Sequence, residues 1–221
     1  MKNGRNTMRN KIDYSLYLVT DRDLMYAKSV EECVEQAVSG GCTVVQLREK
    51  TASSREFYEL AVRTLKITRN YGVPLIINDR ADIALAVNAD GVHIGQKDLP
   101  YKETRRIMGK NKIIGVSVSN LTEAVAAAAE KGVDYLGVGA MFAMDTKKDA
   151  DSTSMDELRR IREKIKLPLV AIGGINKSNI PLFAGTGIDG IAVVSAIVSQ
   201  KDASAAAREL IALFHNTMEK K

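Results

Sequence analysis

Eight short apolar runs, separated by segments with helical spacing, constrain the fold of this chain more than any other feature. The runs lie at 14–20, 42–48, 74–78, 91–94, 112–117, 135–139, 167–173 and 190–194. Strands that alternate with helices predict a parallel sheet, and runs that are apolar on both faces indicate a sheet covered by helices. An open doubly wound sheet would also fit. Eight units within 221 residues, without an internal linker, favour an α/β fold with a single (β/α)8 TIM barrel.

The ends of the chain and of two helical segments can also be predicted. Residues 1–13 are basic and polar and are predicted to be disordered, whereas residues 14–221 should form the single barrel domain. The segment 29–41 ends in two glycines, and the segment 119–132 has Ser119 or Asn120 as a candidate cap and Gly132 as a stop. A last helix is predicted at about 202–217.

Composition excludes several classes of protein. The net charge of +5 is spread along the chain, there is no Trp, and no basic run is interleaved with aromatic residues, so nucleic-acid binding is not expected. No apolar run approaches the roughly 18 residues of a membrane span, and the basic N-terminus is not followed by the apolar core of a signal peptide. Cys33 and Cys42 are too few for a disulfide framework and are interpreted as small buried residues. A cytoplasmic protein without a membrane partner is predicted.

A barrel of this kind places its chemistry at the C-terminal ends of the strands. At the end of the second run, Gln46, Arg48 and Lys50 occupy every second position, whereas Val45 and Leu47 have the opposite parity, so the three polar residues share the face that points to the barrel axis. Desolvated cations need anionic partners. An arginine–glutamate pair at the rim is one possibility, and a phosphate or pyrophosphate that Arg48 grips with two hydrogen bonds is the favoured one. Glu49 lies on the opposite face and is not expected in the site.

Two carboxylates follow the next two runs. Asn78 ends the third run and Asp79 begins its loop, while Asp98 lies in the loop after the fourth run. Mg²⁺ typically takes one or two protein carboxylates and completes its shell with water and substrate phosphates, so the two aspartates could share one ion. A turn or helix cap would use the same residue types. Pro100 fits the start of the next helix.

Two further polar residues lie on the fourth and fifth runs. Ser117, near the end of the fifth run, is a candidate donor to a phosphate. His93 is one of only two histidines and has the opposite parity to its apolar neighbours, which favours a packed, hydrogen-bonded histidine. The scarcity of histidine argues against a mechanism built on histidine acid–base pairs.

The connection after the sixth run, residues 139–154, is long. Loops beyond about 12 residues in compact domains are usually functional or disordered. Thr146 and Lys147 are its candidate ligands, whereas Lys148 is interpreted as a solvated neighbour.

A second anion site is predicted after the last two runs. Gly173 and Gly174 allow backbone N–H groups to approach a ligand closely. Ser195 stands where a short extra helix would begin, which is the usual phosphate site of this barrel. Two anion sites on one open face indicate a protein that joins two phosphorylated small molecules.

Several segments taken together resemble the thiamine phosphate synthase family. They are "YLVTDR", "QLREK", "NDR", "DGVHIGQ", "GVS", "TKKDA", "AIGGI" and "VVSAI", in that order between about residues 14 and 200. The resemblance implies a (β/α)8 barrel that joins 4-amino-2-methyl-5-hydroxymethylpyrimidine diphosphate to 4-methyl-5-(2-phosphoethyl)thiazole and releases pyrophosphate. It also implies a dissociative reaction, Mg²⁺ as cofactor and, at the level of the family, a homodimer.

The resemblance also implies roles for individual residues. The pyrimidine diphosphate would be held by Gln46, Arg48, Lys50, Asn78, Ser117 and Lys147, of which Arg48, Lys50, Ser117 and Lys147 are the catalytic candidates. Mg²⁺ would be bound by Asp79 and Asp98. The thiazole phosphate would be held by Thr146, Gly174, Val194 and Ser195.

The chain departs from the family's pattern in the 139–154 loop. Ala140 and Ala143 replace prolines, and Met144 replaces a threonine that helps to bind the thiazole phosphate. Two alternatives stay open at this point. One is a related thiazole tautomerase, which relies on a histidine where this chain has Ser119. The other is a non-catalytic barrel that binds a phosphorylated ligand. Met144 is the only residue that favours this alternative.

Overall fold

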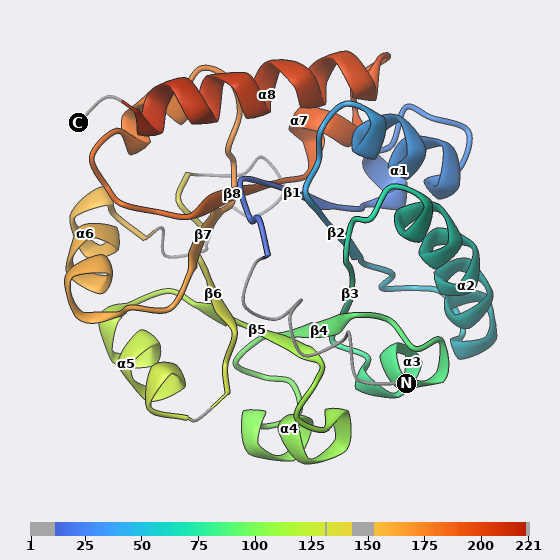
Figure 1. Ribbon diagram of the computed structural model, residues 1–221, viewed down its shortest axis with the longest axis horizontal. Helices are drawn as coiled ribbons and strands as arrows, with labels where there is room; N and C mark the ends of the chain where they lie inside the picture. Colours follow the sequence, from blue (N-terminus) through green and yellow to red (C-terminus); the bar gives the residue numbers. More distant parts are fainter. Residues whose placement is uncertain (1–11, 131, 143–152, 220–221) are drawn as a thin grey trace, which may run out of the picture.

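Eight parallel strands form a closed barrel in the computed structural model, which describes residues 12–130, 132–142 and 153–219 (Figure 1). Each strand pairs with the next, and the last pairs with the first. The single (β/α)8 barrel is therefore confirmed, with strand ends that lie within two residues of the predicted ones. The strands are β1 Leu16–Val19, β2 Val44–Leu47, β3 Leu75–Asn78, β4 Gly91–Ile94, β5 Ile113–Val118, β6 Tyr135–Val138, β7 Leu169–Ile172 and β8 Gly190–Val193.

Helices surround the barrel, and the C-terminal helix lies along its outside next to the first α-helix (Figure 1). Several of these helices have a polar N-cap residue whose side chain accepts a hydrogen bond from the first turn. Ser53 accepts a hydrogen bond from the N–H of Glu56 at 3.3 Å, and the Glu56 carboxylate accepts one from the N–H of Ser53 at 2.8 Å. The helices are η1 Arg22–Leu24, α1 Val30–Ser39, α2 Ser54–Asn70, α3 Ala81–Ala86, α4 Tyr101–Met108, α5 Leu121–Ala129, α6 Met155–Lys164, η2 Ile180–Phe183, α7 Ser195–Val198 and α8 Ala203–Met218.

Two helices differ from expectation. Asn120, one of the two candidate caps, is the N-cap of α5. This helix ends at Ala129, before the predicted stop at Gly132. The connection between β7 and β8 contains the short 3-10 helix η2 in place of an α-helix. Gly185 follows this helix directly after its cap, with a φ of 71° that lies outside the α-helical range, so the helix cannot continue through that residue.

The core has two layers, which follow the alternation of side chains along the strands. Val45 and Leu47 belong to the layer between the sheet and the helices, as predicted. Val44 and Gln46 point the other way, into the barrel. The inner apolar layer consists of Tyr14, Tyr17, Val19, Val44, Ile76, Ile113, Tyr135, Val170 and Ala192.

The end of the barrel where the strands begin, here called the N-terminal rim, repeats one polar contact. The residue before each even-numbered strand accepts a hydrogen bond from the backbone N–H at the start of the preceding odd-numbered strand. The four pairs are Leu16 to Thr43 at 3.1 Å, Leu75 to Asp90 at 2.9 Å, Ile114 to Asp134 at 2.8 Å and Leu169 to Asp189 at 2.8 Å. The polar residues of this rim therefore bind the barrel's own backbone.

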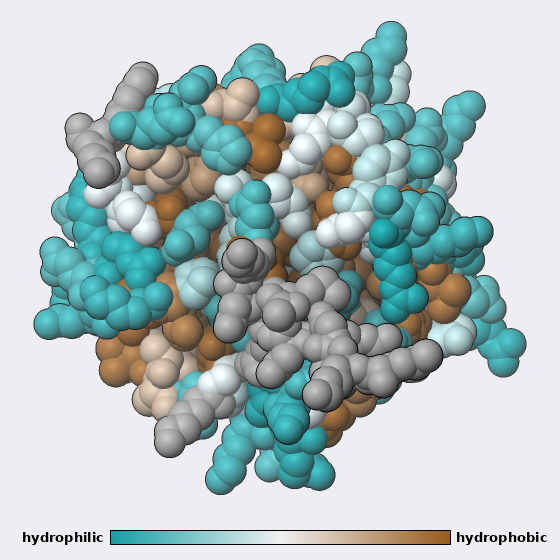
Figure 2. All heavy atoms as spheres, in the orientation of Figure 1, coloured by the Kyte–Doolittle hydropathy of each residue, from teal (hydrophilic) through white to brown (hydrophobic). Residues whose placement is uncertain are grey.

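The outer surface is polar around much of its outline, with apolar atoms between the charged side chains (Figure 2). Within the described ranges, no helix combines the length and the apolar character needed to cross a bilayer. Cys33 and Cys42 are free and buried, as predicted, and burial raises the pKa of the Cys33 thiol to about 11. Neither thiol is therefore suited to act as a nucleophile at neutral pH.

Candidate active site

The strand ends opposite the N-terminal rim, together with the loops that follow them, are here called the C-terminal rim. It carries the predicted site residues of β2, β3 and β5 and of the segments that follow β2, β3, β4, β7 and β8. Asn78 is the last residue of β3 and lies beside His93 of β4 in the sheet register. Thr146 and Lys147 lie outside the described residues. The rim therefore brings together ten of the twelve predicted site residues: Gln46, Arg48, Lys50, Asn78, Asp79, Asp98, Ser117, Gly174, Val194 and Ser195.

The end of β2 carries the alternating polar residues. Gln46 is buried, and its Nε2 donates to the hydroxyl of Tyr17 at 2.9 Å, inside the barrel. Arg48 Nη1 donates to a carboxylate oxygen of Asp21 at 2.9 Å. Asp21 follows β1, so the acid beside Arg48 comes from a neighbouring loop and not from Glu49. Lys50 is exposed at the rim.

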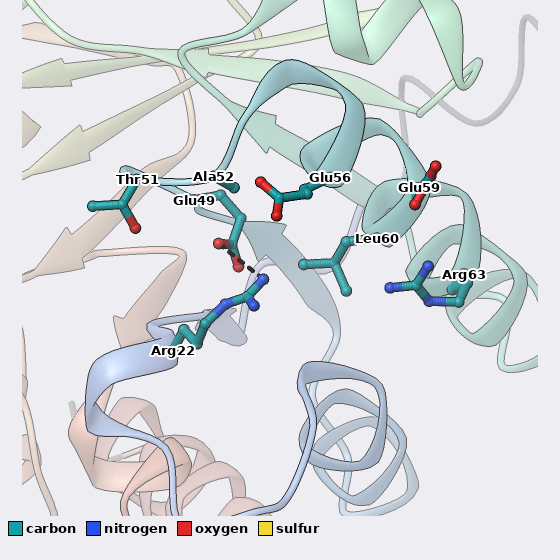
Figure 3. Close-up of a pocket in the computed structure, with 8 residues that line it drawn as sticks. All are labelled: Arg22, Glu49, Thr51, Ala52, Glu56, Glu59, Leu60 and Arg63. Carbon is teal, nitrogen blue, oxygen red and sulfur yellow. Dashed lines mark ion pairs between the residues drawn. The ribbon is translucent and has the colours of Figure 1, made fainter.

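Glu49 points away from these residues, as its parity predicts. Its side chain is 4% exposed and forms an ion pair with Arg22 of η1 at 3.1 Å. The pair lies in a pocket of about 300 Å³ on the outer side of the strand end, between the β1 and β2 loops and α2 (Figure 3). Two neighbouring ion pairs, Asp21–Arg48 and Arg22–Glu49, thus fasten the loop after β1 to the loop after β2. The pocket is lined by Arg22, Glu49, Thr51, Ala52, Glu56, Glu59, Leu60 and Arg63.

Asp79 and Asp98 meet at the rim, as the hypothesis of a shared ion requires. Partial desolvation of Asp79, a hydrogen bond with Asp98 and the negative charge of Asp98 raise the pKa of Asp79 to about 6, while Asn78 and Lys50 act in the opposite direction. Asp79 also has a φ of 61°, which is uncommon for a residue with a Cβ and is often found at functional sites. Pro100, not Asp98, holds the N-cap position of α4. The two aspartates form a close pair of acids that a cation would stabilise.

The structure describes no group of three or more His, Cys, Asp or Glu side chains that could hold a metal ion. The Asp79–Asp98 pair is therefore the candidate cation site at this rim. Two carboxylates suffice for Mg²⁺ when water and substrate phosphates supply the other ligands. Asp98 is fixed in place, because its Oδ2 accepts the backbone N–H of Gly95 at 2.7 Å.

His93 is a packed, hydrogen-bonded histidine, as predicted. Its Nδ1 lies 2.9 Å from the Tyr135 hydroxyl, and its Nε2 lies 2.8 Å from the Ser117 hydroxyl. Burial lowers the pKa of His93 to about 4. The ring is therefore neutral at pH 7, and both of its nitrogens already have partners. It holds Ser117 in place rather than exchanging protons with a substrate.

The ends of β7 and β8 carry two glycines and the predicted short helix. Gly174 has a φ of 66°, and its carbonyl accepts a hydrogen bond from Asn179 Nδ2 at 2.9 Å. Gly173 also lets the β6 loop approach, because a Cβ there would lie 2.7 Å from Cα of Ala140. The predicted short helix begins at Ser195, directly after Val194. The first N–H groups of a helix lack partners within it, so they suit a phosphate.

The described parts of the β6 loop are bound to the barrel. Met141 N–H donates to the Ile172 carbonyl at 2.9 Å, and Thr153 N–H donates to the Ala140 carbonyl at 2.7 Å. Ala143 and Met144, where the family pattern changes, lie outside the described residues. Ser119 stands where the tautomerase would need a histidine. Its hydroxyl donates to Glu123 at 3.0 Å next to the start of α5.

Three residues of this region are missed by the sequence reasoning: Asp21, Tyr17 and Tyr135. Asp21 follows the first run directly. A search for polar residues at the C-terminal end of that run, like the one made for the other runs, would have found it. Tyr17 and Tyr135 have the parity of inward residues, but a hydroxyl inside an apolar run gives no sign of its partner. Their contacts depend on residues far apart in the sequence.

Comparisons with known proteins identify the family to which this chain is similar. A family model described as thiamine monophosphate synthase matches residues 16–197. The chain is 58% identical over 203 residues to a thiamine-phosphate synthase of Clostridium beijerinckii, which covers 92% of this chain and 97% of the relative. It is 56% identical over 209 residues to the thiamine-phosphate synthase of Ruminiclostridium cellulolyticum, with 95% and 99% covered.

Solved structures agree as well. A thiamine phosphate pyrophosphorylase from Pyrococcus furiosus superposes with a TM-score of 0.85 at 42% identity, covering 96% of this chain and all of that one. A 3-hexulose-6-phosphate synthase shares the fold at a TM-score of 0.63 and 18% identity.

Proposed function

This chain belongs to the thiamine monophosphate synthase family, and from that premise we propose how its C-terminal rim makes thiamine phosphate. The protein is a transferase of thiamine biosynthesis that uses phosphorylated substrates. In the proposed reaction, the hydroxymethylpyrimidine diphosphate and the thiazole phosphate give thiamine phosphate and pyrophosphate. The observation that carries the proposal is the Asp79–Asp98 acid pair, with Lys50 close enough to influence it, on the same rim as Ser117 and Arg48.

The diphosphate is proposed to bind over β2, β3 and β5. Lys50 is exposed, and Ser117 is partly exposed, so both are accessible to a ligand at the rim. Asp21 occupies Nη1 of Arg48. A guanidinium has five donors, so other N–H groups of Arg48 can still grip a phosphate while Asp21 holds the side chain in position. Asn78 and Lys147 complete the proposed set, and Gln46 supports it from inside the barrel.

Mg²⁺ fits the Asp79–Asp98 pair on chemical grounds. Both groups are hard oxygen donors, and the raised pKa of Asp79 reflects partial desolvation and the charge of Asp98. When bound, the ion would neutralise these charges and those of the diphosphate oxygens, which stabilises pyrophosphate as a leaving group. Each carboxylate must be ionised to serve as a ligand, so Mg²⁺ binding should release a proton from Asp79 below pH 6.

The thiazole phosphate is proposed to bind over β7 and β8. Gly174 and Val194 approach it with backbone groups, and Ser195 offers a hydroxyl at the start of α7. Thr146 in the β6 loop is the fourth proposed ligand. The thiazole then lies across the barrel mouth from the diphosphate, because β2 to β5 and β7 to β8 occupy different arcs of the barrel.

The proposed chemistry needs charge stabilisation more than acid–base groups. The bond between the pyrimidine methylene carbon and the diphosphate oxygen breaks first, and its electron pair leaves with pyrophosphate. The lone pair of the thiazole nitrogen then forms the new bond to the methylene carbocation. Arg48, Lys50, Ser117 and Lys147 stabilise the charge that develops on the leaving group. His93 is neutral with both nitrogens occupied, which agrees with a mechanism that uses no histidine base.

The compartment and the oligomeric state of the protein are also proposed. The free, buried thiols Cys33 and Cys42 suit the reducing cytoplasm, which we propose as the compartment. A homodimer is the proposed assembly, and light scattering of the purified protein tests it through the molar mass.

The test of the function is an assay with purified protein, both substrates and Mg²⁺. Thiamine phosphate and pyrophosphate should form in equal amounts, and omission of any one component should stop the reaction. Absence of pyrophosphate release would contradict the proposal. A non-catalytic barrel would bind the thiazole phosphate in calorimetry without releasing pyrophosphate. A tautomerase would convert its thiazole substrate without the pyrimidine diphosphate.

A further inference from the structure

Four hydrogen bonds cross the inside of the barrel and end at Ser117. Gln46 Nε2 donates to the Tyr17 hydroxyl at 2.9 Å, and that hydroxyl lies 2.7 Å from the hydroxyl of Tyr135. The Tyr135 hydroxyl lies 2.9 Å from His93 Nδ1, and His93 Nε2 lies 2.8 Å from Ser117 Oγ. The chain thus runs from β2 through β1, β6 and β4 to β5, and it joins two residues assigned to the diphosphate site.

The direction of these bonds can be worked out from the number of hydrogens. An amide nitrogen can only donate, so the Tyr17 oxygen accepts from Gln46. The single hydrogen of Tyr17 then has one partner left among the described residues, the oxygen of Tyr135. Tyr135 in turn donates its own hydrogen to His93 Nδ1. A neutral imidazole with an accepting Nδ1 carries its proton on Nε2, and that N–H donates to Ser117 Oγ.

The reverse direction would leave a hydrogen without a partner. If Tyr135 donated to Tyr17, the hydroxyl hydrogen of Tyr17 would point to no acceptor in the described part of the chain. Both tyrosines are about 1% exposed, so water cannot replace the missing partner without rearrangement. Leaving a buried donor unsatisfied carries its full desolvation cost, so one direction is favoured.

Two strand glycines make room for this chain of bonds. A Cβ on Gly115 would lie 2.3 Å from the Tyr135 hydroxyl and 2.5 Å from His93 Nδ1. A Cβ on Gly137 would lie 3.0 Å from His93 Cε1. In the register, Gly115 lies between His93 and Tyr135, so their hydroxyl and ring nitrogen meet where a side chain would otherwise be.

We propose that Tyr17, Tyr135 and His93 are positioning residues that hold His93 in the Nε2–H tautomer and thereby fix the Ser117 hydroxyl as a donor toward the ligand. This rests on the proposed function, in which Ser117 contacts the pyrimidine diphosphate. Ser117 Oγ accepts from His93, so its own hydrogen is directed away from the ring. An anionic oxygen only accepts hydrogen bonds, so a hydroxyl fixed in this sense suits a diphosphate.

The direct test reads the tautomer of His93 in the free protein at pH 7. Long-range ¹H–¹⁵N NMR spectra distinguish a protonated ring nitrogen from an unprotonated one. The chain has two histidines, and a His215→Gln variant assigns their signals. Nε2–H with an unprotonated Nδ1 is expected for His93. A dominant Nδ1–H tautomer would overturn the proposal, because Ser117 would then donate to the ring instead.

Tyrosine-to-phenylalanine variants test the chain step by step. Tyr135→Phe removes the donor to His93 Nδ1, so a mixture of tautomers is expected, with KM for the pyrimidine diphosphate raised roughly two- to tenfold and kcat changed less. Tyr17→Phe, one step further away, should give a smaller rise. Tyr71→Phe on the exposed end of α2 is the matched control and should change neither. Equal effects of the two core variants would contradict a directional chain.

A double-variant cycle separates positioning from a general loss of packing. In a Ser117→Ala background, Tyr135→Phe should raise KM less than twofold, because the hydroxyl that it orients is gone. A full effect of Tyr135→Phe in that background would overturn the proposal. Failure of this inference differs from failure of the proposed function. A reversed tautomer with normal thiamine phosphate formation rejects only the chain of bonds, whereas an Nε2–H tautomer without turnover rejects only the proposed activity.

Discussion

The two rims of this barrel use the same residue type in opposite ways. At the N-terminal rim, Asp90, Asp134 and Asp189 each accept a backbone N–H of a neighbouring strand at 2.8–2.9 Å. At the C-terminal rim, Asp79 has a φ of 61° and a pKa raised to about 6 by partial desolvation and by Asp98. The first group stabilises the fold. The second places two acids close together, which is the arrangement that the proposed cation would stabilise.

The basic residues at the two rims also differ in how fully they are paired with other groups of the protein. Arg105 of α4 binds Asp134 at 2.9 Å and also the carbonyls of Gly109, Lys112 and Gly132. At the C-terminal rim, Lys50 is exposed, and Arg48 is held through one nitrogen. Substitutions at the two rims should therefore affect different properties, stability at one and catalysis at the other.

The largest effect is expected for Asp98→Asn at the C-terminal rim. This change removes one of the two proposed Mg²⁺ ligands, so kcat/KM should fall by about a hundredfold to a thousandfold. The melting temperature should stay the same or rise, because the charge repulsion with Asp79 is gone. A steady-state assay beside a thermal melt measures both. Near-normal turnover would remove Asp98 from the site.

The next effect is expected at the N-terminal rim. Asp134→Ala leaves Arg105 without its carboxylate partner in a mostly buried pair, with side chains 16% and 11% exposed, and should lower the free energy of unfolding by about 3 kcal/mol. Asp189→Ala is the matched control, since its side chain is 45% exposed, and should cost about 1 kcal/mol. Urea unfolding measures both. A loss of kcat without a loss of stability would contradict the division between the rims.

A smaller effect is expected in the dependence of stability on pH. Because the pKa of Asp79 is about 6 in the folded protein against about 3.9 for a free aspartate, the folded state binds more protons between these values. The free energy of unfolding should therefore fall as pH rises from about 4 to 6, and the cost is fully present above 6. Asp79→Asn should flatten this slope. An identical slope in both proteins would show that folding does not raise the pKa of Asp79.

Much of this architecture follows from the sequence, because strands and inward-facing residues follow a period of two. Gln46 faces the barrel and Leu47 the helices, as the alternation predicts. The meeting of Asp79 with Asp98 also follows, since neighbouring parallel strands bring their C-terminal ends together.

Other features depend on tertiary contacts that periodicity does not specify. The pairing of Arg48 with Asp21 joins residues 27 positions apart, and the contact of Tyr17 with Tyr135 joins residues 118 apart. Gly173 illustrates the same limit, because the close approach of Ala140 to this glycine joins two loops that are distant in the sequence. The connection after β7 contains the short 3-10 helix η2 in place of an α-helix, and it ends before Gly185, whose φ of 71° is not α-helical.

The most direct test of the division between the rims is a titration of the Asp79 carboxyl by ¹³C NMR, without and with saturating Mg²⁺. Without Mg²⁺ the carboxyl should titrate with a pKa of about 6. With Mg²⁺ bound, the ionised form is stabilised, and the pKa should fall below the value of about 3.9 for a free aspartate. A pKa that stays at about 6 in both conditions would contradict the claim that the C-terminal rim is built to hold a cation.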